Sequence, residues 1–115
     1  MKRMNNLNMQ IRLTLYGPKG FPEGTFGKGV AVLLRGVDSL GSLNASAKSI
    51  HMAYSKAWRI VKEAEQGMNF QLIDRMGARG STLTPEGRKL LEIYERLEKE
   101  AENELGQRFA KLLDA

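Results

Sequence analysis

Hydroxyl-bearing and basic side chains gather in two short segments of the chain, residues 54–62 and residues 75–81. Lysine and arginine bind phosphate oxygens, and arginine and serine also hydrogen-bond to the edges of nucleic-acid bases. With two residues upstream, the candidates for this chemistry are Ser42, Lys48, Tyr54, Ser55, Lys56, Arg59, Lys62, Arg75, Arg79 and Ser81. These residue types favour binding of a polyanion, such as double-stranded DNA, over catalysis.

The distribution of charge along the chain agrees with this expectation. Residues 1–91 contain 14 basic and six acidic residues, whereas residues 92–115 contain four basic and seven acidic residues. The formal net charge of the 115-residue chain is +5. A basic body is typical of nucleic-acid-binding proteins, although many small soluble proteins without such a partner are basic too.

The composition excludes several other classes of site. The chain has no cysteine and one histidine, so it offers no thiolate zinc site, disulfide framework or cysteine nucleophile. It shows no catalytic triad, phosphate-binding loop or metal-ligand spacing, and we therefore predict a non-enzyme with no cofactor and no metal. Apolar runs are too short to cross a membrane, and the first residues lack the apolar region of a signal peptide. We expect a cytoplasmic protein.

The elements that must position the candidate residues can be predicted from hydrophobic periodicity. Alternating residues 9–16 predict a half-buried leading strand, and the glycines and prolines of residues 17–25 predict a loop. From about Gly27 the period changes to that of a helix, which Gly41 ends. The apolar face of this helix consists of Val30, Leu33, Leu34 and Val37.

A helix-turn-helix is expected next. Ser42 caps a short helix with Leu43, Ala47 and Ile50 on its buried face, and residues 51–53 form the turn. The second helix covers residues 54–66 and ends at Gly67. Its predicted apolar face is Tyr54, Ala57, Trp58, Val61 and Ala64, so Ser55, Lys56, Arg59 and Lys62 must point outward.

Two residues of this region have a second interpretation. Trp58 could stack on bases, but its place on the apolar face favours packing in the core, with Ile50 and Val61. His51 could contact phosphate or respond to pH, but its place between the helices favours a simple turn residue.

A β-hairpin follows, with arms at residues 70–76 and 81–83 and a tip at residues 77–80. A hairpin directly after a helix-turn-helix makes a winged helix-turn-helix, with residues 75–82 as the wing. Arg79 at the tip is equally compatible with a solvated loop and with a contact to DNA. Thr84 and Pro85 are typical of the N-cap and first position of the next helix.

The last helix carries an apolar stripe, and the helix is long enough to extend beyond the rest of the domain. A helix over residues 85–105 is about 30 Å long, as long as the domain is wide. We expect Gly106 to bend or break it and an apolar face to resume beyond. The stripe predicts pairing with a second copy through Leu90, Tyr94, Leu97, Ala101, Leu105 and Phe109. A glutamate-rich outer face, Glu92, Glu95, Glu98, Glu102 and Glu104, would keep this end away from DNA.

The fold predicted from these elements is mainly α with a small β-hairpin. We expect a winged helix-turn-helix with a leading strand and a long C-terminal dimerisation helix, about residues 85–115. All of residues 1–115 form a single domain in this prediction.

Three stretches carry a resemblance to a known family: GSLNASAK at residues 41–48, MAYSKAW at residues 52–58 and LTPEGR at residues 83–88. They resemble the N-terminal DNA-binding domain of ModE-type molybdate-responsive transcriptional regulators, over roughly residues 9–105. The third stretch is also similar to LysR-type and MarR-type winged helices. The resemblance implies a homodimer that binds palindromic operator DNA. The family's molybdate-binding module would lie beyond residue 115, so we expect no molybdate binding.

Three positions depart from the ModE-type pattern. His51 stands where the family usually has glycine, Ala53 where it often has serine, and Ser55 where it often has a basic residue. The target sequence can therefore differ from that of the family. The sequence predicts a dimeric, sequence-specific DNA-binding regulator of transcription. Two alternatives stay open: a protein-interaction module on the same scaffold, and a small oxyanion sensor with its site at the dimer interface.

Overall fold

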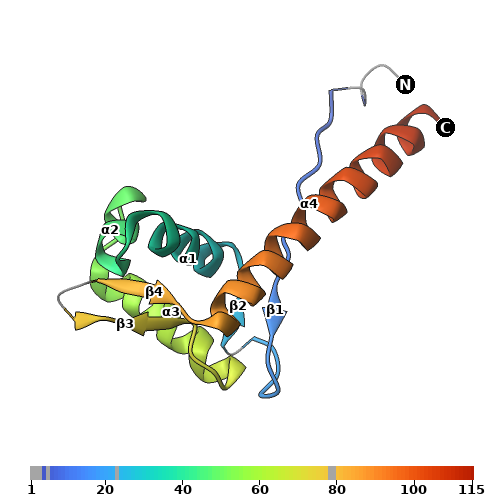
Figure 1. The fold of residues 1–115 in the computed structure, drawn as a ribbon. Coiled ribbons are helices and arrows are strands. Elements are labelled where there is room, and N and C mark those ends of the chain that lie inside the picture. The colour runs from blue at the N-terminus through green and yellow to red at the C-terminus, as the bar shows by residue number, and fades with distance from the viewer. Residues whose placement is uncertain (1–3, 5, 23, 78–79) are drawn as a thin grey trace.

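The computed structural model describes residues 4, 6–22, 24–77 and 80–115. Its elements, in chain order, are β1 (Leu15–Tyr16), β2 (Thr25–Phe26), α1 (Lys28–Leu40), α2 (Leu43–Ser49), α3 (Tyr54–Met68), β3 (Ile73–Arg75), β4 (Ser81–Leu83) and α4 (Pro85–Asp114). The helices α1, α2 and α3 form a body, the β3–β4 pair lies against it, and α4 projects away (Figure 1). The predicted fold class, mainly α with a small hairpin, is confirmed.

The core lies around α1, which contacts each of the other three helices. Its predicted apolar face is confirmed, because Val30, Leu33, Leu34 and Val37 are all buried. Other elements supply the remaining core side chains: Phe26, Leu43, Ala47, Ala57, Val61, Ala64, Leu72, Ile73, Leu83, Leu91 and Tyr94, with Ala31 from α1 itself. Gly41, with a φ of 86°, ends α1 as predicted.

The helices α1 and α2 approach closely at Gly36. A Cβ atom at this position would overlap the side chain of Ser46, so only glycine allows the observed distance between the helices. The buried Ser46 hydroxyl donates a hydrogen bond to the carbonyl of Leu33 at 2.8 Å. This bond satisfies a polar group that would otherwise be costly to bury.

The leading strand is much shorter than predicted. Only Leu15–Tyr16 pair with another strand, and the partner, Thr25–Phe26, lies in the segment predicted to be a loop. The alternation is nevertheless confirmed from residue 11 on, since Ile11 and Leu13 are half-buried while their neighbours are exposed. It does not extend to Met9, which is exposed. These residues run beside α4 rather than beside a strand (Figure 1), and the hydroxyl of Tyr94 donates to the carbonyl of Leu13 at 2.9 Å.

Two predicted helix ends are wrong. Gly106 does not interrupt α4, which is continuous over 30 residues and therefore about 45 Å long. A glycine in a helix interior costs only about 1 kcal/mol relative to alanine, too little to break a helix of strong helix formers. Gly67 does not end α3 either. It is buried in the last turn, where a Cβ atom would overlap the backbone of Gly24, and Asn69 forms the left-handed cap.

Candidate nucleic-acid interface

The helix-turn-helix geometry comes from α2, a tight turn and α3. The hydroxyl of Ser42 accepts a hydrogen bond from the backbone N–H of Ala45 at 3.0 Å, so Ser42 is the N-cap predicted for α2. His51 occupies the left-handed region with a φ of 56°, and the N–H of Met52 donates to the carbonyl of Ala47 at 2.9 Å. His51 is thus a turn residue. Ala53 caps α3 without a side-chain hydrogen bond.

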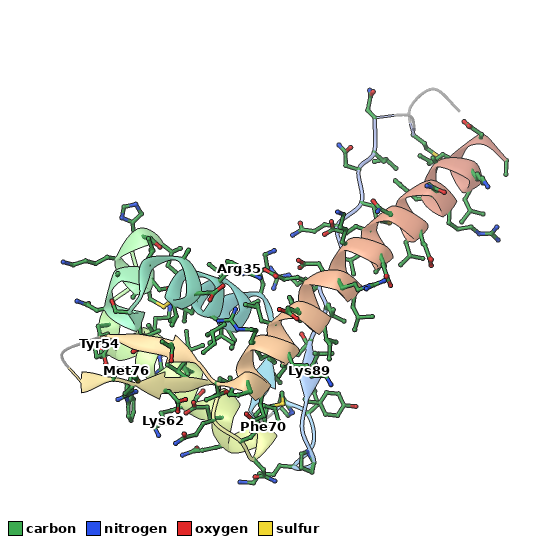
Figure 2. The ribbon with its side chains drawn as sticks, in the orientation of Figure 1. Arg35, Tyr54, Lys62, Phe70, Met76 and Lys89 are labelled. Carbon is green, nitrogen blue, oxygen red and sulfur yellow. The ribbon has the colours of Figure 1, made fainter. Side chains whose placement is uncertain are left out.

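The outward face of α3 carries the side chains predicted for it. Ala57, Val61 and Ala64 are buried against the core, which orients the helix. As a consequence, the predicted polar residues lie on the opposite side: Ser55, Lys56 and Arg59 are exposed and Lys62 is half-buried. Tyr54, Lys62 and Met76 lie on the half of the molecule away from the free end of α4 (Figure 2).

Three apolar residues predicted to lie in the core between the helices do not. Ile50 is 36% exposed, Trp58 37% and Tyr54 45%. Ile50 is the C-cap of α2, beyond the helix's buried face. Tyr54 and Trp58 lie at the edge of the apolar face of α3, where the wing covers them only in part. Two cations lie over the indole ring, with Arg75 Cζ at 5.3 Å and Lys62 Nζ at 5.7 Å from the ring centroid.

The wing is an antiparallel pair in which Ile73 faces Leu83 and Arg75 faces Ser81. The end of the pair next to the tip is tied to the end of α1, because the N–H of Ser81 donates to the carbonyl of Gly41 at 2.8 Å. Gly80, with a φ of 90°, permits this approach, since a Cβ atom there would overlap the Gly41 carbonyl. Arg79, predicted at the tip, lies outside the described residues.

A groove of about 430 Å³ separates the helix-turn-helix from the wing. Four of the predicted DNA-binding residues meet there: Ser42, Tyr54, Arg75 and Ser81. Asn44, which the sequence interpretation missed, also lines it, and its position two residues after the Ser42 cap could have indicated a polar side chain at the start of α2. Lys48 is exposed in the last turn of α2 and does not line the groove.

Glu65 is a second residue that sequence reasoning missed. Its carboxylate Oε2 accepts hydrogen bonds from the backbone N–H groups of Leu72, at 2.8 Å, and Ile73, at 3.3 Å. Lys62 Nζ lies 3.9 Å from the other oxygen, and the Glu65 side chain is only 11% exposed. One carboxylate of α3, which we call the recognition helix, thus holds the backbone at the start of β3.

Ion pairs set the direction in which α4 leaves the body. Lys28 and Arg35 of α1 pair with Glu98 and Glu95 of α4, respectively. Figure 2 shows Arg35 between the two helices. Two of the glutamates expected on a free outer face therefore bind α1. The hydrogen bond from Arg35 to Glu95 is also the main cause of the raised pKa of Arg35.

A further pair joins the start of α4 to the end of α1. Arg88 Nη2 lies 2.9 Å from Asp38 Oδ1. The hydrogen bond from Arg88 lowers the pKa of the Asp38 carboxyl below its ordinary value, and the same bond raises the pKa of Arg88. With the two pairs above, this contact holds α4 against α1 at three points.

The six residues predicted to pair with a second copy do not all lie on a free surface. Tyr94 is 1% exposed and packs in the chain's own core, with its ring against Phe26, so it is not available to a partner. Leu90 is half-buried against the same core. Beyond the body, Leu97 and Leu105 are 42% and 49% exposed, and Ala101 and Phe109 are half-buried.

Candidate metal sites and membrane-spanning helices are both absent from the part of the chain that the structure describes. There, no group of three or more histidine, cysteine, aspartate or glutamate side chains could hold a metal ion. No helix within the same residues has the length and apolar character needed to span a bilayer.

Comparison with known proteins identifies the domain type. Residues 32–88 match the profile of the family described as "Bacterial regulatory helix-turn-helix protein, lysR family". Among solved structures, the chain is similar to one described as "Crystal structure of CbnR_DBD-DNA complex", with a TM-score of 0.61 and 24% sequence identity. The match covers 72% of this chain and 94% of that chain. No curated protein matches the chain. The winged helix-turn-helix fold is confirmed.

Proposed function

From the match of residues 32–88 to the LysR-type helix-turn-helix family, we propose that the chain is a regulator of transcription that binds specific double-stranded DNA as a homodimer. The observation that carries the proposal is the joint placement of predicted DNA-binding residues. Side chains from α2, α3 and the wing line one groove, beside the exposed polar face of α3. In addition, the similar CbnR_DBD structure is described as a complex with DNA.

In this proposal α3 enters the major groove. Ser55 and Arg59 on its exposed face contact base edges, and Lys56 and Lys62 bind the phosphates beside them. Ser42 and Asn44, at the start of α2, bind the DNA backbone on one side of the major groove. The wing residues Arg75, Arg79 and Ser81 reach the adjacent backbone or minor groove.

The homodimer rests on the distal half of α4. The apolar stripe that packs on the body near Leu91 and Tyr94 continues beyond the body, where its residues are exposed or half-buried: Leu97, Ala101, Leu105, Phe109 and Leu112. Pairing of two such helices buries the stripe and places two copies of α3 about 34 Å apart, one turn of DNA. A palindromic operator follows from the two-fold symmetry of that arrangement.

The resemblance to ModE-type regulators supports the same proposal but extends it no further. The stretches that carry the resemblance lie in α2, in the turn, in α3 and at the start of α4. They bear on DNA binding and on no oxyanion site, so we propose no molybdate effector.

The proposal is tested by selecting bound duplexes from a random DNA pool and measuring affinity for the enriched sequence. Arg59→Ala is expected to weaken specific binding by about 1–3 kcal/mol, because a bidentate arginine–guanine contact is worth that much. Arg96→Ala is the matched control, since Arg96 is an exposed arginine on α4 paired with Glu100, and it should leave affinity unchanged.

The salt dependence of binding separates DNA recognition from the main alternative. A protein that neutralises several phosphates loses affinity steeply as salt rises and keeps its sequence preference. A protein-interaction module on this scaffold would enrich no sequence and bind mixed duplexes weakly. That result would refute the proposed function, and a stable monomer in sedimentation at micromolar concentration would refute the homodimer.

A further inference from the structure

Trp58, the chain's single tryptophan, lies between the recognition helix and the wing. Arg75 of β3 and Lys62, one turn further along α3, both lie over its ring, at 5.3 Å and 5.7 Å from the centroid. The ring and Lys62 belong to α3 and Arg75 belongs to β3. The indole is thus a shared contact for one basic residue of the wing and one of the helix.

A cation over an indole face is attracted by the negative charge of the ring's π-system. Long basic side chains otherwise sample many rotamers, and they lose that freedom when they bind a phosphate. An indole that already holds the arginine and the lysine reduces this loss. Trp58 also remains 37% exposed, whereas Ala57 and Val61 beside it are at most 2% exposed. The indole of Trp58 is therefore not primarily a core side chain.

Glu65 holds the other end of the same strand. Its carboxylate accepts the N–H groups of Leu72 and Ile73 at the start of β3, while Trp58 contacts Arg75 at the end. Trp58 and Glu65 are two turns apart on α3. The strand is therefore fixed on the recognition helix at both ends, once through its backbone and once through a side chain.

We propose that Trp58 is a positioning residue that holds Arg75 of the wing and Lys62 of the recognition helix in one arrangement, so that both bind the DNA backbone together. The proposal rests on the proposed DNA-binding function. Trp58 itself contacts neither base nor phosphate in it. Trp58 affects DNA affinity only because it orients Arg75 and Lys62.

Three variants test the proposal by titration of the selected duplex. Trp58→Met keeps an apolar side chain but removes the aromatic face, and it should weaken binding about fivefold to tenfold. Trp58→Phe keeps a ring and should recover most of the affinity. Tyr16→Met is the matched control, because Tyr16 is an aromatic residue of β1 with 58% exposure that pairs with Phe21 rather than with a cation. It should bind as the wild type does.

A double-mutant cycle distinguishes positioning from a structural role. In a chain that already carries Arg75→Ala and Lys62→Ala, Trp58→Met should have almost no further effect on affinity. An equal loss in both backgrounds would overturn the proposal, as would wild-type affinity for Trp58→Met alone. Failure of the wild-type chain to bind any DNA would instead refute the proposed function.

A fluorescence measurement needs no change at position 58. Because Trp58 is the only tryptophan, the tryptophan emission of the chain comes from this side chain alone. Arg75→Ala removes one of the two side chains over the ring and should shift the emission of the folded chain to longer wavelength, with Arg96→Ala as control. Identical emission from the wild type and Arg75→Ala would overturn the proposal even if Trp58→Met fails to fold.

Discussion

Replacing Glu65 with alanine tests how firmly the wing is held on the recognition helix. The substitution removes the acceptor for two backbone N–H groups, at 2.8 Å and 3.3 Å, from a side chain that is 11% exposed. A hydrogen bond to a charged group contributes about 1.5–3 kcal/mol, and a donor left without a partner costs about 1–3 kcal/mol. The bond from Leu72 dominates, because that from Ile73 is long.

The higher helix propensity of alanine offsets only a few tenths of a kcal/mol of this loss of stability. We therefore expect Glu65→Ala to lower the free energy of unfolding by about 3 kcal/mol, a large part of the roughly 5–15 kcal/mol typical of a domain. Glu65→Gln retains an uncharged acceptor and should cost about 1 kcal/mol. Urea unfolding followed by circular dichroism measures both values.

Glu63→Ala provides the matched control, because Glu63 lies on the same helix and is exposed. It should change stability by at most about 0.5 kcal/mol. Hydrogen exchange adds a local measurement, in which the amides of Leu72 and Ile73 should lose protection in Glu65→Ala. If Glu65→Ala is as stable as Glu63→Ala, the carboxylate does not hold the wing and the reasoning is refuted.

Three further predictions concern the turn, the last helix and the acid range. His51→Gly should raise the free energy of unfolding by about 1 kcal/mol, because glycine adopts the observed φ of 56° without steric cost; a decrease in chemical denaturation would contradict this. Gly106→Ala should also stabilise the chain by about 1 kcal/mol, since nothing outside its own stretch of helix lies within 4 Å of the added Cβ; a large gain of helical circular dichroism would show instead that the helix of the wild type is broken there. Arg88 lowers the pKa of Asp38 in the folded chain, so this pair stabilises the fold above the ordinary aspartate pKa and is lost as the pH falls below about 4. Asp38→Asn should therefore lose less thermal stability than the wild type between pH 5 and pH 3, and parallel melting curves would exclude the pair as a cause.

The helices could be predicted from the sequence because each carries a strong periodic signal. Val30 to Val37 determine the buried face of α1, and Thr84 with Pro85 determines the start of α4, whose cap bond from the N–H of Gly87 is 2.9 Å long. Strand β2 could not be predicted. It has only two residues, in a segment rich in glycine and proline, and its pairing with β1 depends on the tertiary fold.

The site was predictable only where helical periodicity determines the direction of a side chain. Ser55 and Arg59 are exposed because they lie on the side of α3 opposite to the buried Ala57 and Val61. The contacts of Trp58 do not follow in this way, because they depend on where the wing lies relative to α3. Glu65 has the same limitation, since a glutamate near a helix end is ordinarily solvated and only the fold brings the wing backbone to it.

Ion pairs with α1 hold only the first part of α4, so a small rotation at these contacts displaces the far end of the helix. Lys28, Arg35 and Arg88 hold its first turns, and the remaining turns extend past the body as one rigid rod (Figure 1). The helix continues for 16 residues beyond Glu98, about 24 Å, so a rotation of 10° about these contacts moves its far end by about 4 Å. That displacement exceeds one base-pair step of B-DNA, about 3.4 Å. In the proposed homodimer, a change of charge at Arg35 that rotates α4 would therefore alter the distance between the two copies of α3.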